Sequence, residues 1–81
     1  MKAIVHVALK KTVLDPQGRA VSSTLNSQGY DAVADVRQGK YFEIELAEGL
    51  DRDSAEAQVR KIAADVLANP VIEDFDVEIR D

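Results

Sequence analysis

The chain has 81 residues, no cysteine, four aromatic residues and a formal net charge of −5. This length indicates one domain, residues 1–81, with a small core, and the lack of cysteine excludes disulfides, thiolate metal sites and a cysteine nucleophile. The negative charge disfavours nucleic acid and anionic membranes as partners, and no stretch is long and apolar enough for a transmembrane helix, so we expect a cytoplasmic protein. Since a thin core without covalent links often depends on self-association, we expect a homodimer or a higher oligomer.

Charge is distributed unevenly along the chain. Residues 1–40 contain six Lys/Arg and three Asp/Glu, whereas residues 41–81 contain four Lys/Arg and twelve Asp/Glu. In a short chain this difference can arise by chance, or it can create two surfaces of opposite sign that suit docking to different partners.

Alternation of residue types predicts a strand over residues 2–10. One face of this strand is apolar, with Ala3, Val5, Val7 and Leu9. The other face is mixed and holds His6, the only histidine. We interpret His6 as a packed or interfacial residue, because general acid–base catalysis also needs a partner group and a cleft. A minimal enzyme that uses His6 with an acid is the alternative.

A first helix is predicted to begin at Asp15 and Pro16, since aspartate is a good N-cap and proline suits the first helical position. We expect Gly18 to help shape this helix start. Gly29 is predicted to end the helix in a left-handed conformation. One side of the helix would carry Ala20, Val21, Thr24, Leu25 and Gln28.

Two short strands with a turn between them are predicted next. They cover residues 33–37 and 40–47, with the turn at Gln38 and Gly39. An alternative is one long strand with a bulge at Gly39. The inward-facing residues of the second strand would be Phe42, Ile44 and Leu46.

A second helix is predicted to begin at Asp51 or Asp53, and the run from Asp53 to Glu56 fits a capping box. Asn69 and Pro70 are expected to end it. Helical spacing predicts a buried face made of Ala55, Val59, Ile62, Ala63 and Val66. The last strand is predicted over residues 71–80, with an inward face made of Phe75, Val77 and Ile79.

The predicted order is β-α-β-β-α-β, or β-α-β-α-β if the middle strand is continuous and bulged. Two helices on one face of an antiparallel sheet form a two-layer α+β sandwich, and this order is typical of the ferredoxin-like arrangement.

Patterns typical of catalysis and of ligand binding are missing. There is no phosphate-binding loop or dinucleotide fingerprint, and Ser22 and Ser23 lie in a predicted helix rather than on a nucleophile elbow. The carboxylate run of Glu73, Asp74, Asp76 and Glu78 could suggest a metal site, but we interpret Asp74, Asp76 and Glu78 as the solvated face of a strand. We therefore expect no catalytic residue, no metal and no cofactor bound by this chain.

The candidate contact site is a cluster of four residues: Arg37, Gly39, Lys40 and Tyr41. Two cations flank a predicted turn and an aromatic residue follows. Arginine and tyrosine are favoured anchors at protein interfaces, which suggests a docking loop. An exposed hairpin with solubilising charges and a phosphate site are the alternatives.

Five segments, in this order and spacing, resemble the PurS family of phosphoribosylformylglycinamidine synthase subunits. They are residues 5–10, 13–18, 29–30, 33–41 and 67–74, and the resemblance covers essentially the whole chain. The individual motifs are short, but together they are specific.

The resemblance implies a non-catalytic subunit of an ATP-dependent carbon–nitrogen ligase of purine biosynthesis. Such a subunit is a dimer that bridges the large synthetase subunit, PurL, and the glutaminase subunit, PurQ. Ammonia from glutamine would then reach formylglycinamide ribonucleotide, with ATP and Mg²⁺ used by PurL. The alternative is a stand-alone dimeric α+β domain that senses a small molecule.

Overall fold

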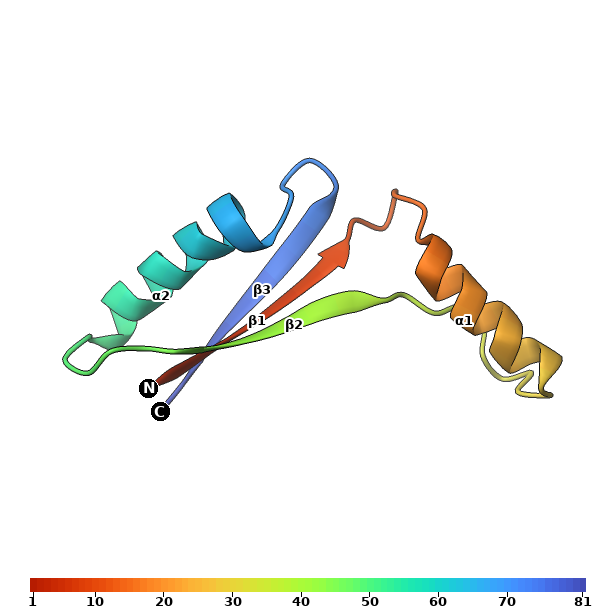
Figure 1. Cartoon of the computed structure of the whole chain (residues 1–81), viewed down its shortest axis with the longest axis horizontal. Helices are drawn as coiled ribbons and strands as arrows, with labels where there is room; N and C mark the ends of the chain where they lie inside the picture. The colour runs from red at the N-terminus through yellow and green to blue at the C-terminus, as the bar shows by residue number, and fades with distance from the viewer.

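A three-stranded antiparallel sheet forms the centre of the computed structural model, which describes residues 1–81 (Figure 1). Its strands are β1 (Lys2–Leu9), β2 (Gly39–Glu45) and β3 (Glu73–Arg80), in the order β2-β1-β3. The α-helices are α1 (Pro16–Ser27) and α2 (Arg52–Ile62), and a π-helical turn, η1 (Ala63–Leu67), follows α2. The predicted α+β class with an antiparallel sheet and a ferredoxin-like arrangement is confirmed.

Strand β1 is the central strand and pairs with both neighbours along most of its length. Val5 lies opposite Phe42 of β2 and opposite Val77 of β3. The two chain termini lie side by side at one end of the sheet, where Lys2 is opposite Arg80 (Figure 1). The strands predicted at the two ends of the chain are confirmed, because their alternating apolar residues share one face that can be covered.

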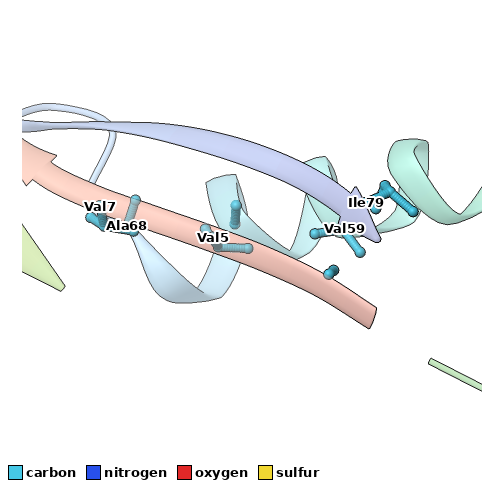
Figure 2. Close-up of a cluster of buried hydrophobic side chains, with 7 residues drawn as sticks. Val5, Val7, Val59, Ala68 and Ile79 are labelled. Atoms are coloured by element: carbon cyan, nitrogen blue, oxygen red, sulfur yellow. The ribbon is translucent and has the colours of Figure 1, made fainter. Parts of the chain in front are cut away.

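Helix α2 covers that face of the sheet. Figure 2 shows Val5, Val7 and Ile79 of the sheet next to Val59 and Ala68, which are part of a buried cluster that also contains Ala3 and Ala63. Only 11 of the 81 residues are buried. Because hydrophobic stabilisation scales with the apolar area removed from water, this core gives a single chain limited stability.

The N-cap of α2 is Asp51, whose Oδ1 accepts a hydrogen bond from the Ser54 N–H at 2.6 Å. The capping box predicted from Asp53 is therefore wrong, since Asp53 lies within the first turn. Val66, predicted to be buried, is 75% exposed. The π-helical turn adds a residue to the last turn and moves Val66 away from the buried stripe. Ile62 also lies outside the core.

Residues 33–37 do not form the predicted strand, and β2 does not extend back into them as a long bulged strand. In the β1–β2 register Ala8 is opposite Gly39, so Arg37 would face Lys10. Since β1 ends at Leu9, these residues have no strand to pair with. The predicted turn at residues 38–39 is also wrong, because Gly39 is the first residue of β2.

Helix α1 projects from the end of the sheet, away from α2 (Figure 1). The prediction that both helices cover one face is therefore correct for α2 only. The molecule measures 51 × 26 × 14 Å, and its radius of gyration is 16.1 Å. A compact chain of this length has a radius of gyration of about 12 Å. Neither helix has the length and apolar composition that a membrane span requires.

Candidate partner-binding site

Asp15 connects the start of α1 to the segment that precedes β2. Its side chain is the N-cap of α1, and Oδ1 accepts the Gly18 N–H at 2.9 Å. Its Oδ2 accepts the Gln38 N–H at 2.7 Å, and the residue is only 4% exposed. The hydrogen bonds from Gly18 and Gln38, with the nearby charge of Arg37, lower the pKa of Asp15 because they stabilise the carboxylate. One buried carboxylate thus holds two distant segments together.

Gly18 lies within the first turn of α1, where the helix meets the returning chain. A Cβ atom at this position would overlap the carbonyl oxygen of Val36 and lie 2.8 Å from Asp15 Oδ2. Only glycine permits this approach of helix and main chain. Gly18 is therefore a close-contact residue inside the helix. We call Asp15, Gly18, Arg37 and Gln38 the α1 junction.

Arg37 holds the turn that follows β1. Its Nη2 donates to the carbonyl oxygens of Lys10 at 2.9 Å and Val13 at 3.0 Å, with a longer contact of 3.4 Å to Leu9. If the pairing of β1 with β2 continued, Arg37 would lie opposite Lys10. The strands no longer pair at this position, and the hydrogen bonds of the Arg37 side chain connect the two segments instead. The guanidinium predicted to dock a partner is thus engaged within its own chain, and its contact with a partner stays a prediction.

Replacing Arg37 with alanine is expected to lower the free energy of unfolding by about 1 kcal/mol, because exposed hydrogen bonds from a charged donor are partly offset by water. Urea denaturation followed by circular dichroism measures this change. The control is Lys2→Ala, which removes a single exposed ion pair with Glu43 at 3.8 Å and should cost less than about 0.5 kcal/mol. Equal effects of the two substitutions would mean that the Arg37 contacts do not support the fold.

Lys40 and Tyr41 lie on opposite faces of the sheet. Lys40 is opposite Val7, on the face that α2 covers, whereas Tyr41 is opposite His6 on the other face. We call this second face, which no helix covers, the open face. The Tyr41 ring meets His6 edge-on, with ring centroids 5.1 Å apart. The four predicted contact residues therefore do not form one surface.

The Tyr41 hydroxyl is part of the polar network of the open face. It donates to Glu43 Oε1 at 2.9 Å, and this hydrogen bond raises the pKa of Tyr41 because it stabilises the protonated phenol. Gly39, the remaining predicted contact residue, begins β2 against β1. A Cβ at Gly39 would lie 2.5 Å from the Val7 carbonyl oxygen, so it too marks a close approach.

Acidic side chains line the open face along β3, as predicted. Asp74 pairs with Lys10 at 3.3 Å, and Arg80 pairs with Glu78 at 3.1 Å. The pair with Arg80 lowers the pKa of Glu78 and raises that of Arg80, since each charge stabilises the other. No group of three or more His, Cys, Asp or Glu side chains is arranged to bind a metal ion.

A polar hollow of about 330 Å³ lies between α1 and the returning segment, next to the α1 junction. Arg19, Ser22 and Ser23 line it from the helix, and Asp35 lines it from the returning segment. Neither this hollow nor the role of Gln38 was predicted from the sequence. The available signal was Gly18, because a glycine inside a predicted helix indicates close backbone contact.

Comparison with known proteins gives consistent matches over almost the whole chain. The family model PurS, described as phosphoribosylformylglycinamidine (FGAM) synthase, matches residues 2–81. The phosphoribosylformylglycinamidine synthase subunit PurS of Bacillus subtilis is 46% identical over 80 residues, which cover 99% of this chain and 93% of the relative.

Two solved structures share the fold. PurS of Methanocaldococcus jannaschii, described as one of the subunits of formylglycinamide ribonucleotide amidotransferase, has a TM-score of 0.87 at 34% identity and covers 98% of this chain and 94% of its own. A chain of the structure of PurLQS from Thermotoga maritima has a TM-score of 0.85 at 28% identity, with coverages of 95% and 93%.

Proposed function

Because this chain belongs to the PurS family of phosphoribosylformylglycinamidine synthase subunits, we propose that it joins the other two chains of that enzyme, PurL and PurQ. In this assembly PurQ hydrolyses glutamine to glutamate and ammonia. PurL uses ATP and Mg²⁺ to phosphorylate the amide oxygen of formylglycinamide ribonucleotide. Ammonia then displaces that oxygen, which leaves as phosphate, with ADP as the other product. This chain supplies no catalytic residue and instead holds PurL and PurQ in place. It does so as a pair of two identical copies.

The observation that carries this proposal is the match of residues 2–81 to the PurS family, together with the likeness to a chain of PurLQS. The positions of Lys40 and Tyr41 on opposite faces of the sheet support it, since a connecting subunit needs separate surfaces for two partners. Holding the two active sites together keeps ammonia away from bulk water, where it would be protonated or lost. We place this activity in the cytoplasm and in one domain, residues 1–81.

Native mass spectrometry of the gently purified, tagged chain tests the assembly, with glutamine and ADP–Mg²⁺ present throughout. We expect complexes that contain a glutaminase-sized chain and a large ATP-binding chain. Glutamine-dependent amidine formation by PurL and PurQ should also rise when this chain is added. Recovery of a homo-oligomer alone, with a melting temperature that rises on adding an amino acid, would instead favour the small-molecule-sensing alternative.

The contact residues are tested in the same experiment. Lys40→Ala should weaken the assembly without unfolding the chain, because the Lys40 side chain is 59% exposed and the substitution removes one ion pair, with Glu73 at 3.7 Å, without adding a charge of the same sign beside Glu73. Lys61→Ala is the matched control, since it removes the same charge from an exposed position of α2. Arg37→Glu does not suit this purpose, since it would also release the main-chain carbonyls that Arg37 binds.

A further inference from the structure

The polar hollow beside the α1 junction has walls that the fold holds in place. One wall is α1, and the other is the returning segment, residues 34–37, which runs next to it (Figure 1). The main-chain N–H groups of Gly18 and Gln38 both donate to the Asp15 carboxylate, which holds the two walls together at one end. A ligand that enters a preformed hollow of this kind has little of the chain to order, so less of its binding energy is lost.

Charged and hydroxyl groups inside the hollow lack partners within the chain. Arg19, Ser22 and Ser23 lie at positions i, i+3 and i+4 of α1 and therefore share one side of the helix. The side-chain hydrogen bonds within α1 are made by other residues, so both serine hydroxyls are free. Asp35 lies on the opposite wall. The ion pairs of the chain involve other residues, so Arg19 and Asp35 line the same hollow without reaching each other.

Two further charges, of opposite sign, are fixed in the lining of the hollow. Arg37 Nη2 donates to the main-chain carbonyl oxygens of Lys10 and Val13, so this guanidinium keeps its position. The buried Asp15 carboxylate already accepts main-chain N–H groups with both oxygens. With Arg19 and Asp35, the lining thus contains two cations and two anions and is neutral as a whole.

This mixture of charges indicates the class of ligand. A simple anion would be attracted by Arg19 and Arg37 but repelled by Asp15 and Asp35, and a simple cation would meet the reverse arrangement. A zwitterion meets favourable charges at both of its ends, because a carboxylate accepts from guanidinium and hydroxyl groups while an ammonium group donates to a carboxylate. The volume of about 330 Å³ lies at the lower end of small-molecule pockets, roughly 300–1,000 Å³, and suits a molecule as small as an amino acid.

We propose that this hollow binds a free α-amino acid, with the ligand carboxylate on Arg19 and the ligand ammonium group on Asp35. The hydroxyls of Ser22 and Ser23 donate to the same carboxylate. Because Arg19 and Asp35 are exposed, binding is weak, with a dissociation constant on the order of 1 mM. The bound amino acid connects α1 to the returning segment at a second point, beyond the α1 junction. The proposal goes beyond the proposed function and does not depend on it.

A titration followed by the backbone amide signals in nuclear magnetic resonance tests the ligand class. The probe is L-glutamine, the amino acid that PurQ would consume. We expect saturable shifts at residues 19–23 and 34–37. Two analogues are matched controls: glutaramate lacks the ammonium group, and 4-aminobutanamide lacks the carboxylate. Each should have a dissociation constant at least about 10-fold higher, because one charge-assisted contact is lost. No shift at these residues up to about 20 mM L-glutamine, or equal binding of either analogue, would overturn the proposal.

Two substitutions test the residues named. Arg19→Gln and Asp35→Asn each remove one charge and keep a hydrogen-bonding group, and each should raise the dissociation constant of L-glutamine at least about 10-fold. Neither side chain is in an ion pair of the chain, so both variants should keep the melting temperature of the wild type. Lys61→Gln is the control, since Lys61 is exposed on α2, away from α1 (Figure 1). An unchanged dissociation constant in Arg19→Gln or in Asp35→Asn, or an equal increase in Lys61→Gln, would contradict the site.

Capture of PurL and PurQ is measured separately on the same protein. A chain that binds L-glutamine in the hollow but captures neither subunit would contradict only the proposed function. A chain that captures both subunits but shows no shift at the hollow would contradict only the amino-acid site.

Discussion

An alanine at position 18 is expected to lower the free energy of unfolding by about 2–3 kcal/mol, as overpacking against a rigid neighbour does. The new methyl group would meet the Val36 carbonyl oxygen and the buried Asp15 carboxylate, and neither can move without breaking the α1 junction. The direction is informative, because Gly→Ala inside a helix normally stabilises it by about 0.5–1 kcal/mol. Close packing is therefore predicted to reverse the sign of the usual helix-propensity effect.

Urea denaturation of Gly18→Ala measures this effect, with Gly29→Ala as the control. Gly29 has a φ of +93°, and a Cβ at this position would meet no atom within 4 Å, so its substitution costs only the left-handed conformation, about 1–2 kcal/mol. A Gly18→Ala variant more stable than the wild type would show that α1 does not approach residue 36 in solution.

Asparagine at position 15 is expected to lower the melting temperature by roughly 10 °C, because two main-chain N–H groups need two acceptor oxygens. Asn offers one oxygen, and its NH₂ group would face the N–H of Gly18 or Gln38. The control is Asp51→Asn, where the main-chain N–H of Ser54 needs a single acceptor and asparagine is a good N-cap. Thermal unfolding followed by circular dichroism compares the two variants, and equal melting temperatures would contradict the bridging role of Asp15.

The stability of the wild type should also depend on pH through Asp15. Its pKa is lowered in the folded state by the hydrogen bonds from Gly18 and Gln38, so its contribution is fully present above the unfolded pKa of about 3.9. That contribution is lost as the pH falls through the lower folded value. As the pH falls below 5, the free energy of unfolding of the Asp15→Asn variant should therefore decrease less than that of the wild type. Urea titrations at several pH values would measure this difference. Identical pH profiles would exclude this linkage.

Much of the secondary structure could be predicted because its signals are local. The alternation in β1 and β3 places their apolar residues on one face, whatever the rest of the chain does. Asp15 and Pro16 begin α1, and Gly29 follows it with a positive φ, because caps act on groups within one turn. The membership of the PurS family could also be recognised from short motifs in order along the chain.

The candidate site could be predicted only in part. Its residues were identified in two groups, around Asp15 and around Arg37, but nothing local indicated that one carboxylate joins them. Val33 to Arg37 has the alternation of a strand, yet β1 ends before it can pair with this segment. Lys40 and Tyr41 were expected on one docking loop, and the pleat of β2 places them on opposite faces.

The sequence by itself determined where α1 begins, which residues of β1 and β3 face the core, and the family to which the chain belongs. Tertiary structure alone decided that α1 leaves the sheet, that Gly18 lies against residue 36, and that Arg37 binds the turn after β1. The features that the sequence alone determined depend on neighbours within about one helical turn or one strand. The features that only the tertiary structure decided depend on where pairing between distant segments stops, and therefore on contacts between residues far apart in the chain.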